Sequence, residues 1–347
     1  MESIKYQTCV LFGGNGFIGS HFAAHLLQNN LANEVILADV VKATPDMWPK
    51  FLQLKFAAGE VKYVQIDVRK PIDSQPDSNQ LPSNPDLIVN LSAVHKEPGH
   101  QAHEYFETNL PGAENVCAWA EKVNCKTIVF TSSIATYGSG QETKDEDSLP
   151  MPTTPYGISK LVAEKIHLAW QNKETQRKLL IVRPGVIFGA GERGNVTRML
   201  RAILGHYFFY SGNQETRKAG GYVKELCNSM AFMLKWQNEH NQPATIFNFT
   251  MDPAPSVQEY AEAMTKVAEV KRTIFNVPFK LLLGTSYFMA MINSAMGRKP
   301  SISPVTVRKV LRSNNIIPKV LKELGYQYQY NLEQGLADWQ KERPIDW

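Results

Sequence analysis

The residues best suited to proton transfer are Ser133, Tyr156 and Lys160. Tyr156 and Lys160 are four residues apart, so a helix would place the phenol and the ammonium on one face. An ammonium beside a phenol favours the phenolate and would lower the pKa of Tyr156 toward neutrality, where the group can serve as an acid or a base. Ser133 ends an apolar run and could aim its hydroxyl at the same substrate oxygen. The three residues predict acid–base chemistry at one oxygen.

A tyrosine and a lysine at this spacing are common by chance, so the rest of the chain must support the interpretation. An apolar run over 9–12 is followed by Gly13, Gly16 and Gly19, and helical spacing of apolar residues resumes over 22–27. A strand, a glycine turn and a helix in this order are typical of a site for the diphosphate of a dinucleotide. We expect Gly13 to take backbone angles closed to other residues, Gly16 to admit the phosphates, and Gly19 to let the helix lie close to the sheet. The helix N terminus would offer N–H groups and partial positive charge to the diphosphate.

Two acids follow the next two predicted strands. Asp39 ends the strand over 34–39, about 20 residues after the last glycine, where a carboxylate can accept both hydroxyls of the adenosine ribose. Its charge would repel a 2′-phosphate, so we expect NAD rather than NADP. Asp67 comes near the end of the strand over 61–68, where it could contact the adenine edge.

The elements that must position these groups alternate between strands and helices. Further strands are predicted over 87–94 and 127–133, with a helix over 103–122 between them and a loop over 69–86. The strand over 87–94 is almost wholly apolar, as a strand buried on both faces must be. We therefore predict an α/β fold with a doubly wound parallel sheet. His95 follows the carboxyl end of a strand, where ligands of such sheets bind.

A second region is predicted from about residue 190, where the alternation weakens and helical patterns appear, for example over 257–269 and 305–311. Residues 1–189 would form the dinucleotide-binding domain with the catalytic residues. Residues 190–347 would form a smaller C-terminal substrate-binding domain, and part of this region could return to the first domain. The apolar stretch 281–292 is too short to span a bilayer and is interpreted as a core or pocket-wall helix, with membrane contact as the lesser possibility.

Composition excludes several classes of protein. The chain has 347 residues, 43% hydrophobic and 20% charged, with a net charge of +4, as expected of an ordinary soluble protein. We expect no nucleic-acid partner, because no basic run contains interleaved aromatic residues. The four cysteines and eight histidines lack the spacing of metal ligands, so we expect no metal and reduced thiols. The N terminus runs directly into the first strand, which leaves no room for a signal peptide and favours the cytoplasm.

The sequence resembles the extended short-chain dehydrogenase/reductase family, the NAD-dependent epimerase/dehydratase group, along most of its length. The matching segments are Gly13-Gly-Asn-Gly-Phe-Ile-Gly19, Asp39, Asp67-Val-Arg69, Asn90-Leu-Ser-Ala93, Asn109-Leu-Pro-Gly112, Thr131-Ser-Ser-Ile-Ala-Thr-Tyr-Gly138, Tyr156-Gly-Ile-Ser-Lys160 and Arg183-Pro-Gly-Val-Ile-Phe-Gly189.

The resemblance implies a Rossmann fold that binds NAD, and a role for each catalytic residue. It makes Tyr156 the acid–base group, Lys160 the residue that lowers its pKa and holds the nicotinamide ribose, and Ser133, counted back from Gly138, the residue that polarises the substrate oxygen. It also implies a homodimer packed through two helices of each cofactor domain. The cofactor residues implied are Gly13, Gly16, Phe17, Ile18, Gly19, Asp39, Asp67, Val68, Leu91, Ala93, Tyr156, Lys160, Pro184 and Val186.

The same resemblance bears on the substrate. Ile134-Ala135 stands where dehydratases of the family usually have Asp-Glu, which disfavours a dehydratase. The segments around 93–99, 193–198 and 217–223 are similar to epimerase-like proteins of bacterial surface-polysaccharide synthesis. This similarity implies a 4-epimerase acting on a nucleoside diphosphate sugar, with Asn195, Arg217 and Lys218 at the diphosphate and His95 at the sugar.

Other interpretations remain open from the residues alone. Arg217 and Lys218 could be solvated surface charges, and His95 could be hydrogen-bonded within its loop. Val186, where many nucleotide-sugar enzymes have asparagine, and the segment over 297–300 favour a hydroxysteroid-type or other small-alcohol dehydrogenase. A catalytically idle NAD sensor is a third hypothesis, against which the intact Ser133, Tyr156 and Lys160 argue.

Overall fold

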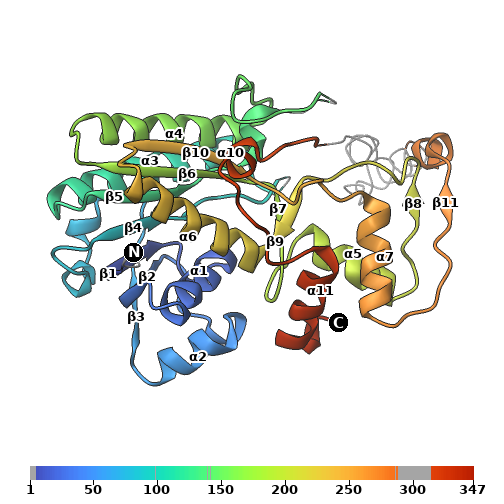
Figure 1. Cartoon of the computed structure of the whole chain (residues 1–347), viewed down its shortest axis with the longest axis horizontal. Helices are drawn as coiled ribbons and strands as arrows, with labels where there is room; N and C mark the ends of the chain where they lie inside the picture. Colours follow the sequence, from blue (N-terminus) through green and yellow to red (C-terminus); the bar gives the residue numbers. More distant parts are fainter. Residues whose placement is uncertain (1–4, 98, 139, 141, 286, 288–313) are drawn as a thin grey trace.

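Seven parallel strands form the centre of the protein, in the order β10, β6, β5, β4, β1, β2, β3 (Figure 1). The structure is a computed structural model that describes residues 5–347 except residues 98, 139, 141, 286 and 288–313. All neighbouring pairs in this sheet run parallel, which confirms the predicted doubly wound fold. The strands are β1 (Tyr6–Phe12), β2 (Ala32–Asp39), β3 (Val61–Gln65), β4 (Leu87–Asn90), β5 (Thr127–Thr131), β6 (Lys178–Pro184) and β10 (Ala244–Phe249).

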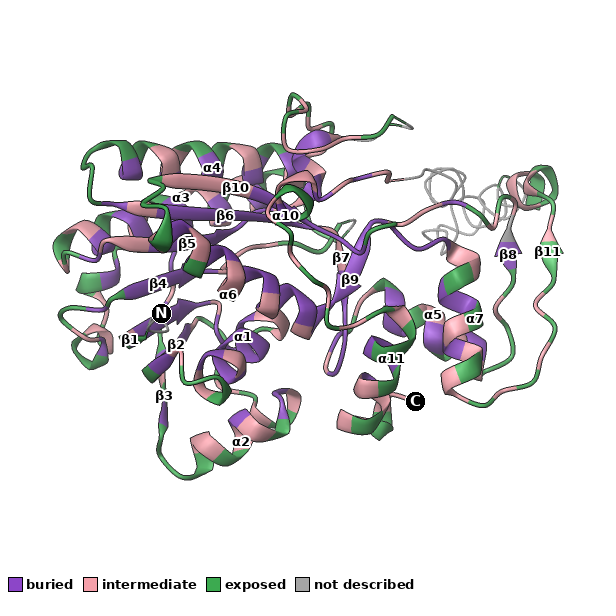
Figure 2. Ribbon diagram, in the orientation of Figure 1, coloured by how far each residue is buried: buried purple, intermediate pink, exposed green. Residues whose placement is uncertain are grey.

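Helices cover both faces of this sheet because its strands carry apolar side chains on both sides. Leu11, Leu37 and Val182 pack on one face in a cluster that includes α1 (Phe17–Gln28), α2 (Lys50–Ala57) and α6 (Val223–Glu239). Val10 and Phe130 pack on the other face with α3 (Ala102–Lys122) and α4 (Pro155–Asn172). Figure 2 shows the strands almost entirely buried between these layers. Successive strand residues thus enter opposite clusters, as the alternation of a strand requires.

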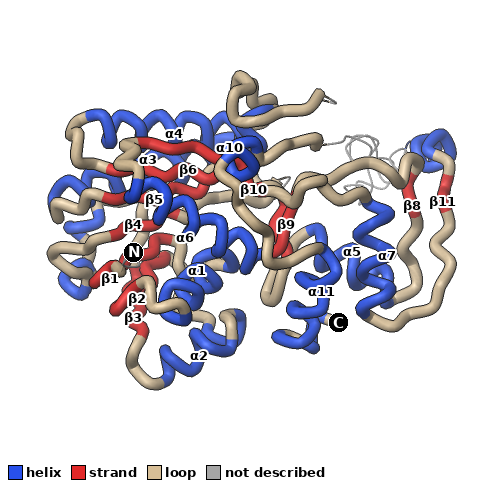
Figure 3. The backbone as a smooth tube through the Cα atoms, in the orientation of Figure 1, coloured by secondary structure: helices blue, strands red, loops and turns tan. Residues whose placement is uncertain are grey.

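A smaller lobe follows the ends of β6 and β10, and we define it as residues 186–222 together with the described residues from 250 to the C terminus. It contains two sheets of two strands, β7 with β9 and β8 with β11, both parallel. Helix α11 packs on α7 and β9, and α5 packs on α7 (Figure 3). Its elements are β7 (Val186–Phe188), α5 (Asn195–Leu204), β8 (Tyr210–Ser211), β9 (Gly220–Tyr222), α7 (Val257–Val267), β11 (Asn276–Val277) and α11 (Leu332–Glu342), whereas α10 (Lys319–Glu323), in the same range of residues, packs on β10 of the large sheet.

Several predicted boundaries differ from those of the structure. The strands predicted over 61–68, 87–94 and 127–133 end earlier, at Gln65, Asn90 and Thr131, because the chain turns away from the sheet to form the loops beyond its carboxyl edge. The first helix begins at Phe17, directly after the glycine turn. The predicted helix over 305–311 and the segment over 297–300 lie outside the described residues.

The apolar stretch over 281–292 is only partly described, since residues 286 and 288–292 lie outside the described ranges. Residues 279–285 are helical. However, 59% of the surface of Leu281 is exposed, so this residue does not lie in the core, contrary to the expectation of a core helix. Within the described ranges, none of the helices combines the length and apolar character needed to cross a bilayer. All four cysteines are buried free thiols.

Candidate active site

The glycine turn between β1 and α1 is shaped by close approaches of the main chain. Gly13 has φ +78°, and a Cβ there would lie 2.8 Å from the carbonyl carbon of Leu91 and from the amide nitrogen of Ser92. A Cβ on Gly19 would lie 2.5 Å from the carbonyl oxygen of Gly13. Gly16 is the N-cap of α1, so no side chain of its own satisfies the first N–H groups of the helix. The turn therefore has the geometry of a diphosphate cradle.

Asn15, inside the same turn, was not among the predicted site residues. Its side chain is buried and acts as a clamp on the loop after β2. The Oδ1 atom accepts hydrogen bonds from Thr44 N at 2.9 Å and from Trp48 Nε1 at 2.9 Å, while Nδ2 donates to the carbonyl of Lys42 at 3.0 Å. The spacing of the glycines could not reveal this role, because the partners are 27 or more residues away.

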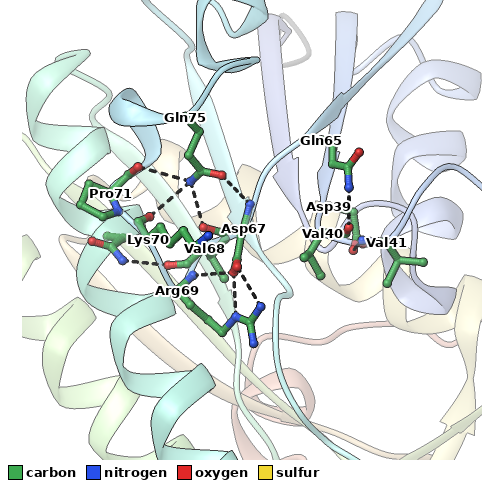
Figure 4. Close-up of polar contacts among 11 residues, drawn as sticks. Asp39, Val40, Val41, Gln65, Asp67, Val68, Arg69, Lys70, Pro71 and Gln75 are labelled. Carbon is green, nitrogen blue, oxygen red and sulfur yellow. Dashed lines mark hydrogen bonds and ion pairs between the residues drawn. The ribbon is translucent and has the colours of Figure 1, made fainter.

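Asp39 stands at the carboxyl end of β2, opposite Gln65 of β3 (Figure 4). Its Oδ1 atom accepts a hydrogen bond from Val41 N at 3.1 Å, and Gln65 Nε2 donates to the carbonyl of Val40 at 3.1 Å. Partial burial raises the pKa of Asp39, while backbone hydrogen bonds oppose the change. These contacts hold the carboxylate at the strand end that follows the glycine turn, the position predicted for contact with the ribose.

Asp67 is held on both its side chain and its main chain (Figure 4). Arg69 donates from Nε to Oδ1 at 2.9 Å and from Nη2 to Oδ2 at 2.8 Å, and these bonds lower the pKa of the carboxyl group. Gln75 accepts from Asp67 N and donates to Asp67 O. Asn115 of α3 donates to the carbonyl of Val68, which is buried next to it. The adenine end of the predicted site is thus bordered by a rigid turn.

The loop after β4 carries Leu91, Ala93 and His95. Leu91 lies against Gly13, and both Leu91 and Ala93 are partly buried. Asn109 of α3 fixes this loop, since its Oδ1 accepts from Val94 N at 2.8 Å and its Nδ2 donates to Ser159 of α4 at 2.9 Å. His95 is exposed on the loop and within electrostatic range of Lys160. Asn109 belongs to one of the segments on which the family resemblance rests, but the sequence did not indicate which groups it contacts.

Ser133, Tyr156 and Lys160 come together at the carboxyl end of β5. The side chain of Ser133 lies close enough to Tyr156 to lower its pKa, and Tyr156 is half-buried beside the ring of Tyr105, at 6.0 Å between centroids. The Nζ atom of Lys160 donates to the carbonyl of Thr131 at 2.7 Å and lies 4.9 Å from the centroid of Phe130. Thr154, the N-cap of α4, accepts from Gly157 N and starts the helix that presents the tyrosine and the lysine on one face.

The electrostatics of this group differ from the sequence-based expectation. Burial raises the pKa of Tyr156 to about 12, although the nearby side chain of Ser133 opposes the change. Burial lowers the pKa of Lys160 to about 7, opposed by the charge of Glu164. The predicted lowering of the tyrosine pKa is therefore wrong for the protein alone, because loss of solvent dominates and Lys160 is not among the groups that lower the pKa of Tyr156.

A buried polar network lies behind the serines. Glu164, four residues after Lys160, accepts from Ser132 Oγ at 2.5 Å and forms an ion pair with Arg183 of β6 at 2.7 Å. Arg183 also donates to Tyr137 Oη at 2.9 Å, and Tyr137 donates to Asn248 of β10 at 2.9 Å. The network joins α4, β5, β6 and β10, so it fixes the strand end that carries Ser133.

The remaining predicted residues lie where β6 leaves the sheet and in the smaller lobe. Pro184 ends β6, and the N–H of Val186 donates to the carbonyl of Ala219 at 2.9 Å. Arg217 Nη1 donates to the carbonyl of Ala254 at 2.6 Å. Lys218 is partly buried, which lowers its pKa to about 8.

Asn195 is exposed at the start of α5, where its Oδ1 accepts a hydrogen bond from Arg198. Asn195, Arg217 and Lys218 were predicted to bind the same diphosphate. Among the described interactions, none joins Asn195 to Arg217 or to Lys218.

The parallel sheet has a glycine turn after β1 and an acid at the end of β2. Beyond β5 it carries Ser133, Tyr156 and Lys160. This arrangement defines an NAD-dependent enzyme of the epimerase and dehydrogenase class. The sequence model of the "NAD dependent epimerase/dehydratase family" matches residues 9–248. The chain belongs to this family, which confirms the resemblance and the choice of NAD as the cofactor.

Individual relatives cover nearly the whole chain. The chain is 28% identical over 330 residues to the N-acetyl-alpha-D-glucosaminyl-diphospho-ditrans,octacis-undecaprenol 4-epimerase of Escherichia coli O157:H7, covering 94% of this chain and 92% of that protein. It is 24% identical to the decarboxylating sterol-4-alpha-carboxylate 3-dehydrogenase of Saccharomyces cerevisiae, covering 96% of both.

The fold is also similar to a solved structure, the UDP-N-acetylglucosamine 4-epimerase of Methanobrevibacter ruminantium in complex with UDP-N-acetylmuramic acid. The TM-score is 0.72 at 17% identity, covering 97% of this chain and 98% of that one.

Proposed function

We propose that the protein is an NAD-dependent 4-epimerase of a sugar that is joined through a diphosphate to its carrier, most directly a nucleoside diphosphate sugar used in surface-polysaccharide synthesis. The observation that carries this proposal is the placement of Ser133 close enough to Tyr156 to lower its pKa, at the same carboxyl edge of the sheet as the glycine turn. The relative from Escherichia coli, named as a 4-epimerase of a diphosphate-linked N-acetylglucosamine, supports it over 94% of the chain.

The residues fit NAD because the turn at Gly13 and Gly19 leaves no space for a Cβ and Asp39 stands at the adjoining strand end. When bound, NAD accepts a hydride from the sugar carbon and can return it to the opposite face. We propose that Asp39 accepts the ribose hydroxyls, that Asp67 and Val68 border the adenine, and that Leu91, Ala93, Pro184 and Val186 line the path to the nicotinamide. Phe17 and Ile18 would present their N–H groups to the diphosphate.

Tyr156 would move the proton. As a base it takes the proton of the 4-hydroxyl while the hydride leaves the same carbon, and as an acid it returns the proton after the hydride comes back. Ser133, which lies near Tyr156, would hold the same substrate oxygen. Lys160 would supply the positive charge that stabilises the phenolate when substrate and cofactor exclude water. An epimerase must take the proton of the hydroxyl and later return it, and Tyr156 beside Ser133 would serve both steps.

Asn195, Arg217 and Lys218 are proposed to bind the diphosphate, and His95 to contact the sugar. A phosphate near Lys218 would oppose the loss of its proton that burial favours. Arg217, whose Nη1 donates to the carbonyl of Ala254 and lies 3.7 Å from Glu259, would bring a guanidinium charge to a phosphate.

A second candidate, a hydroxysteroid-type or other small-alcohol dehydrogenase, is favoured by the sterol dehydrogenase relative, which matches 96% of the chain. The same three residues would then oxidise an alcohol once, and NADH would leave the enzyme. The two candidates differ in whether reduced cofactor accumulates.

The test begins with a thermal-shift titration of the NAD-loaded protein against UDP, GDP, dTDP and a sterol, because a ligand that binds only the folded state raises the melting temperature. The stabilising nucleotide then selects the sugar substrate, and polyprenyl diphosphate N-acetylglucosamine is assayed beside it. Conversion to the 4-epimer without net NADH is the expected result. A response to the sterol alone, with accumulation of NADH, would favour the dehydrogenase.

We also propose a cytoplasmic homodimer. Helices α3 and α4 lie side by side on one face of the sheet, and α4 exposes Ile158 and Val162 one turn apart, 39% and 37% of their surface. Two such faces could pack as a symmetric pair of helices. Sedimentation velocity of wild type and of Val162→Glu tests this arrangement, and the variant is expected to sediment as a monomer.

A further inference from the structure

The smaller lobe ends in an exposed apolar edge that the proposed reaction does not use. Tyr207, Phe209, Phe275 and Leu281 expose 64%, 41%, 72% and 59% of their surfaces, and we call these four residues the aromatic edge. Tyr207 and Phe209 come shortly before β8, Phe275 directly precedes β11 and Leu281 follows it, and Figure 1 shows β8 and β11 at the end of the molecule away from the large sheet. Large apolar side chains gathered in one exposed place indicate a contact surface rather than chance.

The pairing of β8 with β11 brings two of these residues together. Asn276 pairs with Tyr210 in parallel register, and Tyr210 N donates to the carbonyl of Phe275 at 2.9 Å. Phe209 and Phe275 precede this pair on adjacent chain segments. Tyr210 is buried, and successive residues of a strand alternate between faces, so Phe209 points outward.

Arg272 holds the edge in shape. Its Nη1 atom donates to the carbonyl of Ile203 at 3.0 Å and its Nη2 atom to the carbonyl of Phe208 at 2.9 Å. One guanidinium thus ties the segment before β11 to the end of α5 and to the segment before β8. The aromatic side chains are presented by a braced surface, which lowers the entropy lost on binding.

The same segments carry net positive charge, although the exposed Glu269 directly precedes Val270 and Glu262 acts electrostatically on Tyr210. Residues 193–211 contain Arg193, Arg198 and Arg201, residues 270–285 contain Lys271, Arg272 and Lys280, and neither segment contains Asp or Glu. Lys271, Lys280 and Arg201 are exposed. Aromatic residues beside lysine and arginine match the interface of a bilayer with anionic headgroups, where the rings enter the boundary region and the cations meet lipid phosphates.

We propose that the aromatic edge docks the protein on the surface of an anionic bilayer. A second copy of the chain fits this surface less well, because a two-fold contact would set the same cations against one another. The docking goes beyond the proposed function and does not require it. If the sugar were carried on a polyprenyl diphosphate, however, the same lobe that contains Arg217 and Lys218 would meet the carrier at the membrane.

The test is co-sedimentation of the full chain with vesicles of phosphatidylcholine alone or mixed with phosphatidylglycerol. We expect binding to the anionic vesicles that weakens with added salt, and about tenfold weaker binding to the neutral ones. The double variants Phe209→Ser/Phe275→Ser and Lys271→Glu/Lys280→Glu should each lose about tenfold in vesicle affinity. Leu54→Ser on α2 is the matched control, because Leu54 is 63% exposed at a different place, and it should bind as wild type does.

Melting temperature and NAD affinity verify that each variant is folded. Equal binding to both vesicle types, or variants that bind like wild type, would overturn the proposal. A dimer seen without vesicles and lost in Phe209→Ser/Phe275→Ser would assign the edge to a second copy instead. Activity on soluble nucleotide sugars is measured separately, so a failure of the proposed reaction would leave the vesicle result standing.

Discussion

Glu164 and Arg183 form a buried ion pair with two hydrogen bonds, from Arg183 Nε to Oε1 at 2.8 Å and from Nη2 to Oε2 at 2.7 Å. Their side chains are only 1% and 4% exposed. The pair connects α4 to β6. Ser132, the neighbour of Ser133 in the chain, donates to the carboxylate of Glu164. Glu164 itself lies one helical turn after Lys160. We infer that Glu164 is a positioning residue for the catalytic strand end.

Removing one partner should be far more harmful than removing both. Glu164→Leu leaves an uncompensated buried guanidinium, and we expect a loss of about 3–5 kcal/mol in the free energy of unfolding. Glu164→Leu/Arg183→Met should recover part of this loss. Denaturant unfolding measures both, with Lys266→Ala of the exposed pair Lys266–Glu333 as a control that should change stability by at most about 1 kcal/mol. Equal losses in the single and double variants would contradict the pairing.

Gly13 and Gly59 have nearly the same backbone conformation, φ +78° and +75°, but different surroundings. A Cβ on Gly59 has nothing within 4 Å, whereas on Gly13 it would lie 2.8 Å from the main chain of Leu91. Gly59→Ala should therefore cost only the strain of the left-handed conformation, about 1 kcal/mol. Gly13→Ala should in addition distort the turn and weaken NAD binding by about tenfold or more. Calorimetric titration with NAD would refute this role if both variants bound equally.

Asp39 and Asp67 should act differently on cofactor choice. Asp39→Ala removes both the acceptor for the ribose hydroxyls and the charge that repels a 2′-phosphate, so NAD should weaken about tenfold and the preference over NADP should shrink. Asp67→Asn loosens Arg69 without touching the ribose position, so both cofactors should weaken by a similar factor. The affinities of each variant for NAD and for NADP are measured side by side. An unchanged ratio of the two affinities in Asp39→Ala would contradict the role proposed for Asp39 at the ribose.

Tyr156→Phe should abolish turnover, by at least about a hundredfold, and leave NAD affinity nearly intact, because only the proton carrier is lost. Tyr105→Phe is a matched control, since its ring lies 6.0 Å from that of Tyr156 and its hydroxyl bonds to the carbonyl of Lys96. The control should retain most of its activity. Loss of NAD binding in Tyr156→Phe, with chemistry retained, would overturn the role proposed for Tyr156.

Stability of the NAD-free protein should depend on pH through Lys160. Its pKa falls from 10.5 to about 7 on folding. Between these values the unfolded chain binds a proton that the folded protein does not, so stability should rise with pH across this range. Below about pH 7 both states carry the proton, and the folded state bears the full penalty of a buried charge. Lys160→Met should remove this dependence, so the stability of the variant relative to wild type should fall by about 2 kcal/mol between about pH 7 and pH 9. Chemical unfolding at several pH values checks the difference, and a constant difference would contradict the lowered pKa.

The sequence predicted the parts of the fold and site that depend on local pattern. The parallel sheet followed from apolar strands alternating with helices, and Gly13 and Gly19 occupy the close approaches that their spacing indicated. Ser133 and Tyr156 meet as expected, since a strand end and a helix N terminus converge at the carboxyl edge of the sheet. These predictions needed only the periodicity of each element and the direction of the strands.

What depended on distant contacts was missed. Asn15, Asn109 and Glu164 each act through partners that lie 15 to 50 residues away, on other elements or loops. The pKa of Tyr156 was misjudged because two neighbouring groups were considered without the burial that tertiary packing imposes on both. The strands over 61–68, 87–94 and 127–133 were predicted too long, since apolar residues continue past the last sheet hydrogen bonds into the loops of the site.

The return of the chain to the large sheet has a consequence for how the protein can be made or divided. The sheet is left at Pro184 and gains its edge strand only at Ala244, where β10 pairs with β6. A fragment ending at residue 189 would therefore expose β6, a strand with an apolar centre, as an open edge ready to associate with other chains. On the ribosome, the sheet can close only after the first part of the smaller lobe has been synthesised. The two lobes are thus committed to folding together, and a single cut in the gene cannot yield a transplantable cofactor module.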